Sequence, residues 1–147
     1  MGRIPFVVTV VCAAGAFGAC TSSAPEREVV LPDPEAGPLQ VVRAYVDALD
    51  ANDEGTASRL ITREHHELSW IGSVEAITDL EASEPVREDP RWSGRPRTAE
   101  VVRVPVTFGV TWSDPDPSVE DGRQLWSYLL IRDQDSGRWL IFDEGMG

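Results

Sequence analysis

The stretch "TAEVVRVPVTFGVTW", residues 98–112, decides the fold. Apolar residues recur at every second position, which is the period of a β-strand with one buried face. Pro105 and Gly109 interrupt this period, so we expect the strand to bend or to carry a bulge there. The positions that share the predicted buried face are all apolar: Val102, Val104, Val106, Phe108, Val110 and Trp112.

Two further strands are predicted downstream of this one. "LWSYLLIRD", residues 125–133, and "GRWLIFDEG", residues 137–145, are rich in branched and aromatic residues, and the "QDSG" between them has the composition of a tight turn. "SVEAITDLEAS", residues 73–83, has an ambiguous pattern, because Val74, Ile77 and Leu80 would also suit a helix. We favour a strand, since strongly β-type sequence follows.

Helices are expected upstream. In "GPLQVVRAYVDALDAND", residues 37–53, one apolar stripe follows helical spacing: Leu39, Val42, Val46 and Leu49. Pro38 suits a first helical turn, and Asn52 or Asp53 can cap a second short helix, "EGTASRLI". Helices followed by an antiparallel meander predict an α+β fold, with the first helix packed across a curved sheet.

The first twenty residues, "MGRIPFVVTVVCAAGAFGAC", have the pattern of a targeting segment. Arg3 precedes an apolar run, Ile4–Phe17, which is shorter than the roughly 20 residues that span a bilayer. We predict a signal peptide over residues 1–19. Its removal takes Cys12 with it, so Cys20 would be the sole cysteine of the mature chain and would have no disulfide partner.

Residues 20–37 are rich in Ser, Pro, Glu and Asp without an apolar period, which predicts a flexible polar linker. The folded domain is then expected over residues 38–147. The formal net charge is −12, and every basic residue is arginine. This acidic balance argues against nucleic-acid binding and against docking on anionic lipid through a basic patch.

The residues before Cys20 resemble a bacterial lipobox. Gly18 and Ala19 fit its small positions, whereas Phe17 replaces the usual leucine. The resemblance implies acylation of the Cys20 sulfur, palmitate being a typical chain, with cleavage before Cys20. The protein would then be lipid-anchored on the extracytoplasmic face of the cell membrane. An ordinary secretory signal with a chance cysteine is the alternative.

The domain also resembles a known superfamily. "VVRAYVDALDANDEGTASRLIT", residues 41–62, and "GRWLIFDEGMG", residues 137–147, are similar to the opening helix pair and last strand of the nuclear transport factor 2-like (SnoaL-like) superfamily. That resemblance implies a cone-like fold with a pocket between helix and sheet. The superfamily holds isomerases, dehydratases, cyclases and non-catalytic binders. The whole chain resembles lipoproteins of high-GC (actinobacterial) bacteria.

Acid–base candidates are few. "EHHE", residues 64–67, contains His65 and His66, which a helix would point in different directions, and a solvated helix end is the simpler interpretation. Strand alternation sends Asp143 and Glu144 to opposite faces, so one of them could enter the pocket. A hydroxyl that holds an enolate could come only from the two tyrosines of the chain, Tyr45 and Tyr128.

Other clusters favour a surface role. Four arginines surround Trp92 and could grip an anion, although a solvated hairpin loop is the simpler interpretation: Arg87, Arg91, Arg95 and Arg97. The acidic segment 114–122 has Val119 where a calcium loop of the EF-hand type needs glycine. Four tryptophans are expected to be mainly core: Trp70, Trp112, Trp126 and Trp139. No sequence motif indicates a metal or a cofactor.

These observations favour a membrane-anchored lipoprotein with a non-catalytic domain that binds a small molecule or an envelope protein. The alternative is an acid–base enzyme of the isomerase or dehydratase kind, with His65, His66, Tyr128 and Asp143 as its candidate residues. This alternative predicts a buried titratable group beside a tyrosine. A homodimer formed through the open sheet face is a third possibility.

Overall fold

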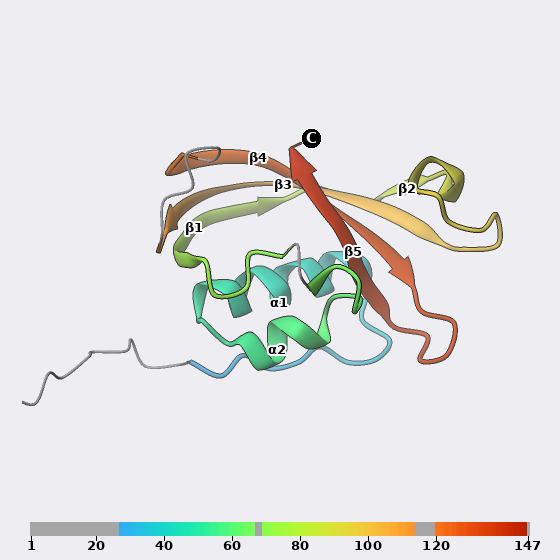
Figure 1. The fold of residues 1–147 in the computed structure, drawn as a ribbon, viewed down its shortest axis with the longest axis horizontal. Coiled ribbons are helices and arrows are strands. Elements are labelled where there is room, and N and C mark those ends of the chain that lie inside the picture. The colour runs from blue at the N-terminus through green and yellow to red at the C-terminus, as the bar shows by residue number, and fades with distance from the viewer. Residues whose placement is uncertain (1–26, 67–68, 114–119, 147) are drawn as a thin grey trace, which may run out of the picture.

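The computed structural model describes residues 27–66, 69–113 and 120–146. The expected signal peptide and Cys20 lie outside these residues, as does most of the acidic segment 114–122. Within the described part of the chain, no helix combines the length and apolar character needed to cross a bilayer. Figure 1 shows two helices on one side of a curved sheet.

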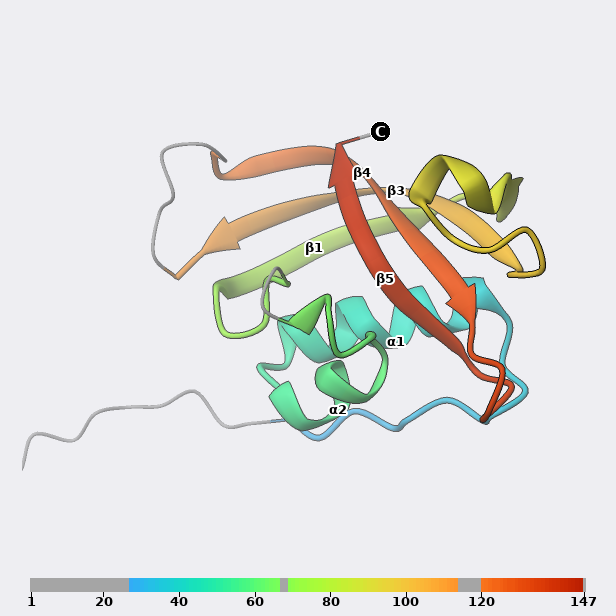
Figure 2. The same cartoon turned by 45° about the vertical axis from the view of Figure 1, so that its right-hand side comes forward.

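Helix α1, Pro38–Asp50, lies across the concave side of the sheet (Figures 1 and 2). Pro38 occupies the first turn, where its missing N–H group breaks no helical bond. Three residues of the expected apolar stripe are buried, Val42, Val46 and Leu49, and Leu39 is partly buried; Tyr45 extends the buried face and is fully enclosed. Helix α1 therefore places a tyrosine ring in the interior between the helices and the sheet.

Helix α2, Glu54–Arg59, is capped by Asp53 as the sequence predicts. One carboxylate oxygen, Oδ1, accepts a hydrogen bond from the Thr56 backbone N–H at 2.9 Å. The other, Oδ2, accepts one from the Val29 N–H at 2.8 Å, and the Thr56 hydroxyl donates to the Val29 carbonyl at 3.2 Å. The part of the expected linker that the structure describes is thus fixed to the domain by Asp53 and Thr56.

Replacing Asp53 by alanine is expected to lower the free energy of unfolding by about 0.5–2 kcal/mol, the usual cost of losing a helix N-cap. The N–H groups of Val29 and Thr56 lower the pKa of Asp53 below its ordinary value of 3.8. The stabilisation of the folded state by Asp53 is therefore complete above pH 3.8 and is lost as the pH falls through the lowered pKa. Urea unfolding at neutral and acidic pH measures both effects.

Asp47→Ala is the control for this prediction, because Asp47 is exposed on α1 and lies outside the cap. Its effect should stay within about 0.5 kcal/mol. An Asp53→Ala protein that unfolds at the same urea concentration as the unsubstituted chain would refute the capping role.

The sheet is antiparallel and has the strand order β1-β3-β4-β5, with the short β2 also paired to β3. The strands are β1 Val74–Ala82, β2 Val86–Glu88, β3 Val101–Trp112, β4 Gly122–Arg132 and β5 Trp139–Met146, and a 3-10 turn, η2, covers Pro90–Ser93. The ambiguous segment 73–83 is confirmed as a strand. The α+β class, with N-terminal helices packed on a curved antiparallel sheet, is also confirmed.

Strand β3 follows the predicted alternation from Val102 onward, because all six positions expected on one face are buried, and Val101 at its start is buried as well. The bulge that was expected in β3 lies instead in the neighbouring strand β1. Strand β3 keeps an unbroken register with β4, whereas β1 carries an extra residue between Thr78 and Glu81, and Asp79 there has a φ of 52°. Gly109 permits the close approach, since a Cβ at this position would lie 2.6 Å from the Thr78 hydroxyl.

A further bulge lies in β5 and decides which acidic residue faces inward. Leu130 pairs with Ile141 and Leu129 with Asp143, so Phe142 is the extra residue. Ile141 points into the core, and simple alternation would send Asp143 inward as well. The bulge reverses this order, because an inserted residue shifts every later side chain to the opposite face.

Candidate active site

The turn that follows α2 brings His65 into the interior. Ile61 forms a parallel bridge with Ile141 of β5, and the Thr62 N–H donates to the Ile141 carbonyl at 2.8 Å. The turn closes when the His65 N–H donates to the Thr62 carbonyl at 3.1 Å. A chain segment far from β5 in sequence is thereby held beside it, and His65 is only 2% exposed.

The neighbouring histidine points the other way. His66 is exposed, and its Nε2 lies 3.2 Å from the Ser58 hydroxyl. The interpretation of "EHHE" as a solvated helix end therefore holds for His66 and is wrong for His65.

Glu144 is the acidic residue that enters the interior. It lies opposite Tyr128 across the β4–β5 ladder, whereas Asp143 is exposed on the outer face. The candidate Asp143 is corrected accordingly, since the bulge at Phe142 gives its inward position to Glu144. Alternation between the two acids holds, but the sequence alone could not show which one enters.

His65 and Glu144 form a buried pair. His65 Nε2 lies 3.1 Å from Glu144 Oε1, and the side chains are 2% and 3% exposed. The second carboxylate oxygen, Oε2, accepts a hydrogen bond from the Trp126 indole N–H at 3.4 Å. Each oxygen of the carboxylate therefore has one donor from a different element.

This arrangement fixes where the neutral histidine carries its proton. An ionised carboxylate can only accept hydrogen bonds, so the imidazole nitrogen that faces it must carry hydrogen. The proton then lies on Nε2, and Nδ1 keeps its lone pair. Within the described residues, Nδ1 is buried and has no hydrogen-bond partner. In its neutral form the ring therefore offers Nδ1 as a base to the interior.

Two tyrosines accompany the pair. Tyr45 of α1 and Tyr128 of β4 are fully buried, and their rings meet edge to face with centroids 5.6 Å apart. The Tyr128 hydroxyl has no hydrogen-bond partner among the described residues, whereas the Tyr45 hydroxyl lies close to Ser69 and to the backbone of Trp70. Burial raises the pKa of both phenols, and the negative charge of Glu144 raises each pKa further. Both hydroxyls therefore stay protonated at neutral pH and can donate to a ligand.

Aromatic side chains extend the interior beyond the polar groups. Trp70 packs against Trp126 with centroids 4.4 Å apart and against Trp112 at 4.7 Å. Trp112, Trp126 and Trp139 are buried, which confirms their prediction as core residues, and Trp70 is partly buried.

The arginine cluster does not converge on one point. Arg87 pairs with Glu100 at 3.2 Å, and Arg91 pairs with Asp89, whose pKa it lowers to about 2. Arg95 stacks on the Phe142 ring with its guanidinium carbon 4.4 Å from the centroid. Arg97 is exposed. The structure thus does not gather the four cations into an anion site.

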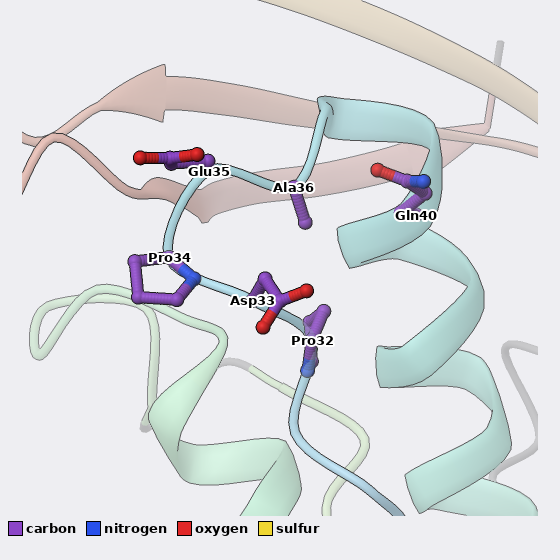
Figure 3. Close-up of a pocket in the computed structure, with 6 residues that line it drawn as sticks. All are labelled: Pro32, Asp33, Pro34, Glu35, Ala36 and Gln40. Carbon is purple, nitrogen blue, oxygen red and sulfur yellow. The ribbon is translucent and has the colours of Figure 1, made fainter.

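Several open pockets lie on the surface, away from the buried pair. One is formed by residues 32–36 and by Gln40 at the start of α1, where Asp33 and Glu35 give it an acidic character (Figure 3). Another lies between the turn at residues 61–64 and the β4–β5 turn. Neither is lined by His65 or Glu144. In the described segments, no group of three or more His, Cys, Asp or Glu side chains could hold a metal ion.

Comparison with known proteins gives one structural match. No protein-family model matches the sequence, and no curated protein does so either. A crystal structure described as "Putative Scytalone Dehydratase", from Novosphingobium aromaticivorans DSM 12444, matches 74% of this chain and 83% of its own, with 14% identity and a TM-score of 0.44.

Proposed function

We propose that this domain is an acid–base catalyst that transfers a proton within a small molecule, as an isomerase or dehydratase does. The observation that carries the proposal is the buried His65–Glu144 pair beside two protonated tyrosines. Burying a polar atom without a partner costs about 1–3 kcal/mol. His65 Nδ1 and the hydroxyl of Tyr128 are two such atoms in one interior, and a bound ligand would give them partners.

Each group has a role in this chemistry. His65 Nδ1 takes the proton from a carbon next to a carbonyl, and Glu144 stabilises the resulting imidazolium. The tyrosine hydroxyls donate hydrogen bonds to the oxygen on which negative charge develops. His65 then returns the proton, either to another carbon, which completes an isomerisation, or to a leaving hydroxyl, which departs as water.

We also propose that the domain acts outside the cytoplasm, attached to the membrane by a lipid. The leader and the solitary Cys20 support a mature chain that carries lipid on this residue and stays on the outer face of the membrane. Mass spectrometry of the mature N-terminus tests this placement. A diacylglyceryl group on Cys20 is expected, and a free thiol or a cleavage site elsewhere would contradict it.

Binding without turnover is the second candidate function. It is favoured by the closure of the site, since His65, Glu144 and both tyrosines are at most 3% exposed. A ligand held there would exchange slowly with solvent. The same interior would then serve recognition of a small molecule, and no reaction would follow.

The probe 5-nitrobenzisoxazole separates the two candidates. Removal of its ring proton by a base breaks the N–O bond and releases a coloured phenolate. We expect the full chain to accelerate this opening and His65→Gln to lose about 100-fold or more of the rate, a normal contribution of a general base. His66→Gln is the matched control and should keep the rate, because His66 lies on the surface.

Equal rates of ring opening for the full chain and His65→Gln would contradict the catalytic proposal. If the probe quenches tryptophan fluorescence without opening, and His65→Gln removes this binding, the non-catalytic function is the better description. Neither result depends on the lipid anchor.

A further inference from the structure

Trp126 has a contact with the candidate site that the proposed reaction does not use. It lies on β4 two residues before Tyr128, the cross-strand partner of Glu144. Residues two apart on one strand share a face, so the indole reaches Glu144 diagonally across the ladder. Its N–H donates to Glu144 Oε2 at 3.4 Å, while His65 lies 3.1 Å from Oε1.

We propose that Trp126 is a positioning residue, whose indole N–H completes the hydrogen bonding of the Glu144 carboxylate and so holds the His65 proton on Nε2. The consequence for catalysis rests on the proposed function, because it requires Nδ1 to be the base. The effect on the proton position of His65 stands apart from any reaction.

The physical reason lies in the second carboxylate oxygen. Without the indole N–H, Oε2 becomes a buried acceptor with no partner, which is costly. The carboxyl group can relieve this loss by taking one proton from solvent. A neutral carboxyl can then donate to His65 Nε2, which must give up its own hydrogen. The ring proton moves to Nδ1, and the free base disappears.

Trp112 provides a matched control. It is as buried as Trp126, since both are 8% exposed, and both indoles pack against Trp70. The Trp112 indole N–H, however, has no hydrogen-bond partner in the described part of the chain. Trp112→Phe therefore removes a comparable aromatic surface without touching Glu144.

The test reads the proton position directly. The full chain is labelled with ¹⁵N-histidine, and its two histidines are assigned with His66→Gln. Nitrogen–proton correlation spectra distinguish the two neutral forms of the ring. We expect the Nε2–H form of His65 in the unsubstituted chain and in Trp112→Phe, and the Nδ1–H form in Trp126→Phe. An unchanged Nε2–H pattern in Trp126→Phe would overturn the inference.

A second replacement protects the test against misfolding. Exchange of the Trp126 indole for a benzothiophene keeps the shape of the ring and removes only the N–H group, so the same shift of the proton is expected. The ring opening of 5-nitrobenzisoxazole is measured in parallel. A moved proton without any probe opening leaves this inference standing and refutes the proposed function, whereas a proton that stays on Nε2 refutes the inference whatever the probe does.

Discussion

Replacing Glu144 by leucine is expected to lower the free energy of unfolding by about 1–3 kcal/mol, because it leaves the buried Nε2–H group of His65 without a hydrogen-bond partner. His65 would keep its place, since its turn is held by the bridge between Ile61 and Ile141. Its Nε2–H would then face an apolar side chain at 2% exposure. Urea unfolding followed by tryptophan fluorescence measures the change.

Two comparisons make this result specific. Asp143→Asn changes the adjacent acid on the outer face and should move stability by less than about 0.5 kcal/mol. The double substitution of His65→Phe with Glu144→Leu should recover much of the loss, because a buried pair can often be replaced by apolar groups at little net cost. A single Glu144→Leu protein as stable as Asp143→Asn would contradict the buried pair.

Neither tyrosine is expected to ionise in the folded protein as the pH rises through 10.0, the ordinary value of a phenol. Burial disfavours tyrosinate, and the charge of Glu144 adds to the effect. Since the folded-state pKa lies above the unfolded one, the stabilisation is complete below pH 10 and is lost at higher pH. Tyrosinate absorbance should therefore rise in a single step that coincides with alkaline unfolding.

This titration is simple to interpret, because the chain has two tyrosines and both are fully buried. Tyr45→Phe and Tyr128→Phe each leave one phenol to observe. Each variant should show half of the absorbance change, again together with the loss of folded structure by circular dichroism. A step near pH 10 in a protein that is still folded would show that its remaining hydroxyl reaches solvent.

The regular elements follow from local pattern. Strand β3 was predictable because one face is wholly buried, so every second residue from Val102 to Trp112 had to be apolar. Helix α1 was predictable for the same reason at the helical period. In both cases the sequence itself carries the periodicity that burial requires.

The candidate site was predictable only in part, because long-range pairing builds it. His65 is buried by the contact between the turn after α2 and Ile141, and no sequence pattern near residue 65 predicts this contact. Glu144 replaces Asp143 because Phe142 is a bulge, and no glycine or proline marks the bulge in the sequence. The role of Trp126 depends on the cross-strand register, which local pattern leaves open.

The attachment of Val29 to Asp53 and Thr56 bears on how far an acylated chain could reach from a bilayer. Arg27 is the first residue that the structure describes, and its N–H donates to the Ala51 carbonyl at 3.4 Å. Only seven peptide steps separate it from Cys20, and at about 3.5 Å each they extend to roughly 25 Å at most. A lipid at Cys20 would therefore confine the domain to a thin layer above the headgroups.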